Sequence, residues 1–214
     1  QAPLEVAVHN FGWRASMYTA AIGGLVIAIL IWFTVPKRPN WFLKLAELEN
    51  KESTANMFAG LREVVSNRQT WLVSVISLLL YVPISTFGAL WGDAYISTST
   101  GVSDEKAAWA MTMLFLGFAA GGPLLGWLSD KYNTRRMPMF LGGGLCAASM
   151  AMLLLASALP FWLTVVFLIL TGFFAGAQAI TFAMSVEQHS TYCKATAVAF
   201  VNFFVMLGGF LLQP

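Results

Sequence analysis

The strongest constraint on the fold of this chain is a series of six long apolar stretches. They occupy residues 15–36, 71–95, 107–128, 138–158, 161–184 and 195–212. An α-helix needs about 20 mostly apolar residues to cross the hydrocarbon core of a bilayer, and each stretch is close to that length. Asp93 is the only charged side chain within them, and a charge at the bilayer centre costs at least ~2.5–3.5 kcal/mol. The pattern predicts an all-α, polytopic membrane helical bundle.

Composition argues against a soluble stack of buried helices. The chain is 58% hydrophobic and 10% charged, whereas soluble domains carry about 25% charged residues. The two cysteines, Cys146 and Cys193, are expected in a span and in a loop, so we expect neither a disulfide between them nor a metal site. We also expect no cofactor.

The basic residues indicate how the spans are oriented. If the spans alternate in direction, ten of the twelve Lys and Arg residues fall in connections on one side. These ten are Lys37, Arg38, Lys44, Lys51, Arg62, Arg68, Lys131, Arg135, Arg136 and Lys194. Only Arg14 and Lys106 fall on the other side, and the positive-inside rule therefore predicts that the basic side is cytoplasmic. Most tryptophans lie near a proposed span end, as an aromatic belt at the two interfaces requires.

The connection at residues 37–70 is longer and more charged than the later connections. Near its end, Leu61, Val64 and Val65 alternate with charged residues at helical spacing, which predicts an amphipathic surface helix leading into the next span. A long linker after one span and before five more is typical of the centre of a two-halved transporter.

A short charged turn, GWLSDKYNTRR at residues 126–136, separates two of the spans. It resembles the loop signature of the major facilitator superfamily, roughly G-x-x-x-D-[RK]-x-G-[RK]-[RK]. The matching residues are Gly126, Asp130, Lys131, Arg135 and Arg136. Asn133 replaces the family's second glycine, and Thr134 replaces a basic residue. Because Asn tolerates a left-handed backbone better than most non-glycine residues, we expect the turn to be kept.

The resemblance implies a division of the chain into three parts. Residues 1–36 would be the end of helix 5 and helix 6 of the amino-terminal half of the family fold. Residues 37–70 would be the cytoplasmic central linker, and residues 71–214 would be helices 7–11 of the carboxy-terminal half. On this register we expect a fragment that lacks helices 1–4 and helix 12.

In the family, this charged turn holds the two halves together on the cytoplasmic side and releases them as the protein opens inward. The resemblance implies the same gating role for the matching residues of the turn. The Asp130 carboxylate is placed to accept backbone N–H groups from the start of a neighbouring helix. Arg135 and Arg136 can pair with carboxylates, Glu187 being one candidate, or with anionic lipid headgroups. The alternative is a basic loop that only sets the topology.

Uncharged polar side chains at helical spacing mark the faces where a solute could bind. One face of the span at 71–95 carries Ser74, Ser77, Tyr81, Ser85, Gly88 and Gly92, and steps of seven in the span at 161–184 give Thr164, Thr171 and Gln178. Polar groups on a membrane helix face protein or a water-filled cavity rather than lipid. We therefore predict that Tyr81, Ser85, Gln178 and Asn202 line the solute cavity. The alternative is that each of them hydrogen-bonds a neighbouring helix.

Two backbone features complete the pattern. Pro83 removes a backbone hydrogen bond from its span, which predicts a kink there. Glycines at small-xxx-small spacing predict close helix packing. They are Gly117, Gly121, Gly122, Gly126, Gly172 and Gly176.

These observations favour a secondary active or facilitative transporter that moves a small solute by alternating access. The absence of Lys and Arg at membrane depth favours a neutral, zwitterionic or amphipathic solute. The expected partners are that solute, the lipid bilayer and the missing amino-terminal half; we expect a monomer that binds no nucleic acid. A bacterial inner membrane is the expected location. A non-transporting receptor or scaffold on the same fold is the main alternative, and an intramembrane enzyme is the other.

Overall fold

The computed structural model describes residues 2–34, 57–155 and 159–212, and it divides the chain into two units, residues 1–54 and 55–214. In the first unit, helix α1 (Ala2–Thr34) is interrupted at Gly12, whose φ of 80° is accessible to glycine but costly for other residues. The part from Phe11 to Thr34 is long and apolar enough to cross a membrane. The predicted linker lies outside the described residues up to residue 56.

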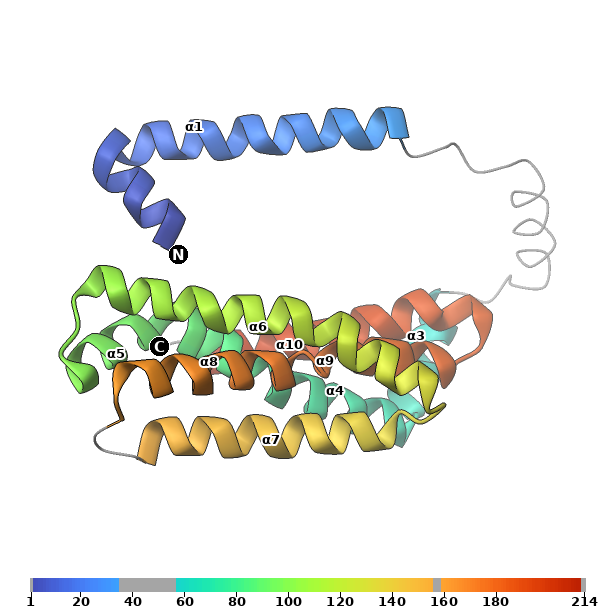
Figure 1. The fold of residues 1–214 in the computed structure, drawn as a ribbon. Helices are drawn as coiled ribbons and strands as arrows, with labels where there is room; N and C mark the ends of the chain where they lie inside the picture. The colour runs from blue at the N-terminus through green and yellow to red at the C-terminus, as the bar shows by residue number, and fades with distance from the viewer. Residues whose placement is uncertain (1, 35–56, 156–158, 213–214) are drawn as a thin grey trace. The chain divides into compact units, whose positions relative to one another are not determined.

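The second unit is a bundle of helices (Figure 1). Its elements are α3 (Met57–Ser66), α4 (Arg68–Val82), the π-helix η1 (Pro83–Trp91), α5 (Gly92–Thr100), α6 (Asp104–Lys131), α7 (Arg136–Leu155), α8 (Phe161–Ala175), α9 (Gln178–Glu187), the 3₁₀ turn η2 (Thr191–Cys193) and α10 (Lys194–Leu212). Elements α4, η1 and α5 form one span, and α8 and α9 form another. With α1, the described residues contain six helices of membrane-crossing length and apolarity, which confirms the predicted spans and the all-α fold.

The outside of the bundle carries large apolar side chains. Leu79, Phe140 and Phe210 are 61%, 77% and 78% exposed, and comparable side chains cover much of the surface. A soluble monomer rarely exposes apolar patches larger than a few hundred Å². The core, by contrast, lies around α6, which packs against α5 and α8, and Met111 and Leu114 are fully buried there. This distribution of apolar surface suits a protein whose solvent is lipid.

The predicted amphipathic helix is confirmed as α3. Its Val64 is fully buried against Cys193 and Ala197 near the start of α10, while Leu61 remains exposed. The chain then turns into α4 at Asn67, whose side chain accepts a hydrogen bond from the Gln69 backbone N–H at 2.9 Å. Asn is a preferred residue at helix starts because its side chain satisfies one of the unpaired N–H groups.

Pro83 changes the type of helix rather than ending it. The segment from Pro83 to Trp91 is a π-helix, continuous with α4 before it and α5 after it. Proline cannot donate a backbone hydrogen bond, and single π turns inside α-helices are frequent at functional sites. The helix is therefore widened in the middle of the span, and the kink predicted at Pro83 stays a prediction.

Glycines bring α6 and α8 into backbone contact. A Cβ on Gly121 would overlap the backbone oxygen of Phe173, and a Cβ on Gly172 would overlap that of Leu114. The prediction of close packing is thus confirmed at these positions, and also at Gly117 and Gly176. Gly126, in contrast, has open space around it among the described residues. For Gly126 the packing prediction is wrong among the described residues, because no atom lies within 4 Å of the place that a Cβ would take.

Candidate functional site

The connections at residues 132–135 and 188–193, together with α3, lie at one end of the second unit, which we call the basic end. Arg135 is at the centre of its charged groups. The guanidinium forms ion pairs with Asp130, at the end of α6, and with Glu187, at the end of α9, where Nη2 lies 2.5 Å from Oε1. It also donates to the Ser129 hydroxyl at 3.0 Å. The prediction that Glu187 pairs with an arginine of the turn is confirmed.

The two carboxylates fix the charge of Arg135. Its pKa is raised above the ordinary value, mainly by the hydrogen bonds to Glu187 and then to Asp130. The side chain of Arg135 is 26% exposed, whereas those of Asp130 and Glu187 are 67% and 49% exposed. The network is therefore a permanently charged cation held between two carboxylates that are largely open to solvent. We expected Asp130 to accept backbone N–H groups, but the partner found is the Arg135 side chain.

The turn itself is kept despite its departures from the family signature. Asn133 has a φ of 46°, the left-handed conformation expected from its place in the motif. Around it, Thr134 N–H donates to the Ser129 carbonyl at 3.1 Å, and the Ser129 hydroxyl donates to the Thr134 carbonyl at 2.9 Å. The prediction for Asn133 is confirmed, and this turn directs Arg135 back towards Asp130.

The other matching residues take no part in this network. The Lys131 ammonium lies over the Trp127 ring, 4.9 Å from its centroid. Arg136 is exposed, and no ion pair joins it to any other residue that the structure describes. The structure thus separates the turn into one bridging arginine and two cations that remain available at the surface. Sequence alone did not distinguish them.

Of the predicted cavity residues, Gln178 is the most deeply placed. Its side chain is 6% exposed and its amide donates to the Ser77 hydroxyl at 3.4 Å, linking α9 to α4. The Thr181 hydroxyl donates to the Gln178 carbonyl at 2.6 Å and lies 2.9 Å from the same Ser77 hydroxyl, which is free to donate to it. Gln178 therefore makes the interhelical bond that was its alternative assignment, and its role towards a solute stays a prediction.

The remaining three cavity residues are more accessible than Gln178. Tyr81 is half-buried, with its ring 6.1 Å from that of Phe118 on α6. Ser85 is half-buried within η1, and Asn202 is exposed on α10. They belong to three different helical segments, α4, η1 and α10. Their assignment to a solute cavity likewise stays a prediction.

Sequence reasoning missed several polar contacts between helices. The buried His189 lies between the Thr70 hydroxyl, 3.0 Å from Nε2, and the Ser185 carbonyl, 2.7 Å from Nδ1. Because a carbonyl only accepts, Nδ1 carries the hydrogen and Nε2 accepts from Thr70 in the neutral ring. On the far side of α8, the Thr171 hydroxyl donates to Ser149 at 2.9 Å. Ser149 and Thr171 were marked in the sequence by their polarity within apolar stretches, whereas Thr70, Ser185 and His189 lie outside those stretches and carried no such signal.

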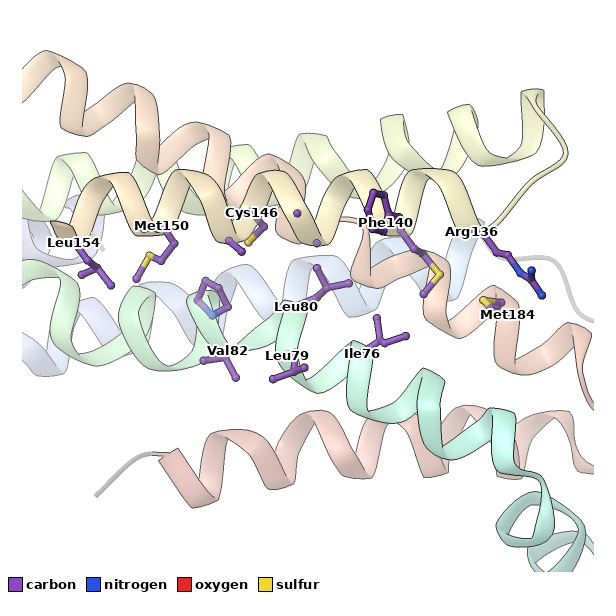
Figure 2. Close-up of a pocket in the computed structure, with 16 residues that line it drawn as sticks. Ile76, Leu79, Leu80, Val82, Arg136, Phe140, Cys146, Met150, Leu154 and Met184 are labelled. Carbon is purple, nitrogen blue, oxygen red and sulfur yellow. The ribbon is translucent and has the colours of Figure 1, made fainter. Parts of the chain in front are cut away.

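A groove of roughly 900 Å³ runs between α4, α7 and α9 (Figure 2). Its walls include Ile76, Leu80, Phe140 and Met150, and Arg136 lies at one end. None of the four predicted cavity residues lines it. The groove is suited to hydrocarbon, and the polar residues predicted to bind a solute lie elsewhere in the bundle.

Comparison with known families gives the assignment. The model of the Major Facilitator Superfamily matches residues 5–213. The chain belongs to the major facilitator superfamily. It is consequently part of a multi-pass membrane protein, in agreement with its six apolar helices. No solved structure was found to match this superfamily member.

Curated relatives within the superfamily carry several names. The membrane sensor protein UhpC of Escherichia coli is 28% identical over 97% of this chain and 51% of its own length. The gallate transporter of Pseudomonas putida is 25% identical over 91% of this chain and 48% of its own length. The probable hexose phosphate transport protein of Chlamydia trachomatis is 24% identical over 95% of this chain and 50% of its own length. The chain thus spans about half the length of the curated relatives it matches.

Proposed function

We propose that this chain is part of a secondary transporter that moves a small solute across a membrane by alternating access. Membership of the superfamily and relatives named as transporters support transport. The observation that carries the mechanism is the Arg135 bridge, which joins the end of α6 to the end of α9. These helices belong to different spans, so breaking the bridge frees the basic end to open.

The strength of the bridge suits a gate that opens in each cycle. Exposed ion pairs contribute about 0.2–1 kcal/mol each, and both carboxylates are substantially exposed. A contact of this size holds one conformation but yields to a modest difference in solute affinity between two conformations. Asp130 and Arg135 form the gate in this proposal, while Lys131 and Arg136 supply positive charge beside it. Together with the basic linker, they support the proposal that the basic end faces the cytoplasm of a bacterial cell, at its inner membrane.

For the solute, we propose that this half contributes uncharged polar contacts, from Tyr81, Ser85, Gln178 and Asn202. The apolar stretches contain no Lys or Arg to neutralise an anion. Two relatives are named for gallate and hexose phosphate, which are anions at neutral pH. An anionic solute would therefore draw its cationic partners from residues outside these stretches, and a neutral or zwitterionic solute would not need them.

Flux measurements on the full-length protein test the proposal. The protein is reconstituted in proteoliposomes and offered labelled gallate, glucose 6-phosphate and glucose. With any solute that is taken up, we expect Arg135→Gln to lower the initial rate at least about tenfold, whereas Arg68→Gln, at an exposed arginine of α4, keeps it. An unchanged rate for Arg135→Gln would leave the turn as a determinant of topology only.

A sensor without transport is the second candidate, because one relative is named a membrane sensor protein. A sensor would bind one of these solutes to the reconstituted full-length protein without accumulating it inside the vesicles. Equilibrium binding measured on the same vesicles separates the two functions.

A further inference from the structure

The start of α10 is held by a helix from the linker. Val64 of α3 is fully buried there, in a cluster with Cys193 and Ala197, and Phe200 packs against this cluster. Three other apolar side chains of α3 stay exposed: Phe58 at 74%, Leu61 at 43% and Val65 at 41%. The apolar contact between α3 and α10 is therefore narrow, and it depends mainly on one valine.

A single carboxylate oxygen completes the attachment. Oε1 of Glu63 accepts hydrogen bonds from the Ser190 hydroxyl at 2.8 Å, the Ser190 backbone N–H at 3.4 Å and the Cys193 thiol at 3.1 Å. Burial raises the pKa of the Cys193 thiol above its ordinary value, so the thiol keeps the proton that it donates. The buried sulfur is thus covered by α3 and bonded to it.

The contact with Glu63 helps to cap the start of α10, which has no capping side chain of its own. Ser190 occupies the N-cap position of η2, which leads directly into α10, but its own side chain makes no capping hydrogen bond. The first N–H groups of a helix need partners, and negative charge is favourable at that end. Glu63 brings a negative charge to this end and accepts the Ser190 backbone N–H, from a helix about 130 residues earlier in the chain.

We propose that α3 is a releasable strap: Glu63 holds the linker helix on the start of α10, and the strap lifts when the basic end opens. While it is attached, it covers Cys193 and keeps α10 beside α4, because α3 leads directly into α4. When it is released, Cys193 becomes accessible to water. The release of α3 rests on the proposed transport cycle, whereas the covering of Cys193 does not. Separate experiments can therefore overturn the covering and the release.

Thiol labelling tests the covering. Full-length protein carrying Cys146→Ala is reconstituted in vesicles, and the rate of Cys193 modification by a water-soluble maleimide is measured. We expect Glu63→Ala to raise this rate at least about tenfold, because the strap loses all three hydrogen bonds. Glu63→Gln keeps an acceptor oxygen, so its labelling rate should lie between those of the original protein and Glu63→Ala. Arg62→Ala, at the exposed neighbouring position on α3, serves as the control and keeps the original rate.

An equal rate in Glu63→Ala and the control would overturn the covering. Val64→Ala provides a second variant if Glu63→Ala does not fold, since it weakens the same attachment through packing and should also speed labelling. Peptide mapping on the full-length protein identifies the modified cysteine in every variant.

Reversible cross-linking tests the release. In a Glu63→Cys variant that also carries Cys146→Ala, a short bis-methanethiosulfonate reagent joins position 63 to Cys193. We expect uptake of the transported solute to fall several-fold after cross-linking and to recover with a reducing agent. Unchanged uptake in the cross-linked protein would show that the strap stays attached throughout the cycle, and would overturn its release while leaving the transport function intact.

Discussion

The seam between α6 and α8 is made of glycine and backbone, whereas the seam between α4 and α9 is made of hydroxyl and amide side chains. At Gly121 and Gly172 a single added methyl group would meet backbone oxygen, which cannot move aside. At Ser77, Gln178 and Thr181 the helices are joined by hydrogen bonds between side chains. These side chains can rotate into other conformations. The first seam fixes two helices at one distance, and the second leaves room for adjustment.

This difference has a functional meaning in a protein that changes conformation. Hydrogen bonds between membrane helices average only about 0.6 kcal/mol, because alternative partners exist when they break. Close backbone packing has no such alternative. We therefore expect α6 and α8 to move together, and relative motion to occur where α4 meets α9.

The largest effect is expected from Gly121→Ala. The added Cβ overlaps the Phe173 backbone, and overpacking of this kind costs about 1–3 kcal/mol. Thermal unfolding of the detergent-solubilised protein measures the loss. Gly143→Ala is the matched control, because the space around Gly143 is open. Equal stability of the two variants would mean that the α6–α8 seam is as adjustable as the other.

A smaller effect is expected from Thr181→Val, which keeps the shape of the side chain and removes the bonds to Ser77 and to the Gln178 carbonyl. The expected loss is about 0.6 kcal/mol and at most about 1.7 kcal/mol, measured by the same unfolding assay. Thr86→Val is the control: the buried Thr86 hydroxyl has no hydrogen-bond partner among the described residues, so its removal should cost nothing. A loss as large as that of Gly121→Ala would contradict the distinction between the seams.

The smallest effect on stability is expected from Asn202→Ala, because Asn202 is exposed on α10. If Asn202 contacts the solute, the apparent affinity for uptake falls about two- to tenfold, as expected for one hydrogen bond worth about 0.5–1.5 kcal/mol. Gln178→Ala should lower both affinity and stability, since its amide also bonds to Ser77. Normal affinity in both variants would remove these residues from the solute site.

The sequence by itself determined the features that depend on neighbouring residues. Exclusion of charge from hydrocarbon defines each span locally, helical spacing around Val64 defines α3, and the left-handed preference of Asn defines the turn at Asn133. Each of these was predicted without knowing where any helix lies, and each is found.

Only the tertiary structure decided which residues meet. Arg135, rather than Arg136, bridges two carboxylates, one of them 52 residues away, because the turn and the end of α9 converge on it. Glu63 is hydrogen-bonded to Cys193, 130 residues later in the chain, and Gln178 is hydrogen-bonded to Ser77, 101 residues earlier. Such contacts depend on which spans pack together, and uniformly apolar helix surfaces carry little information about their neighbours. The pairing is set by fine features of shape, above all the glycines between α6 and α8.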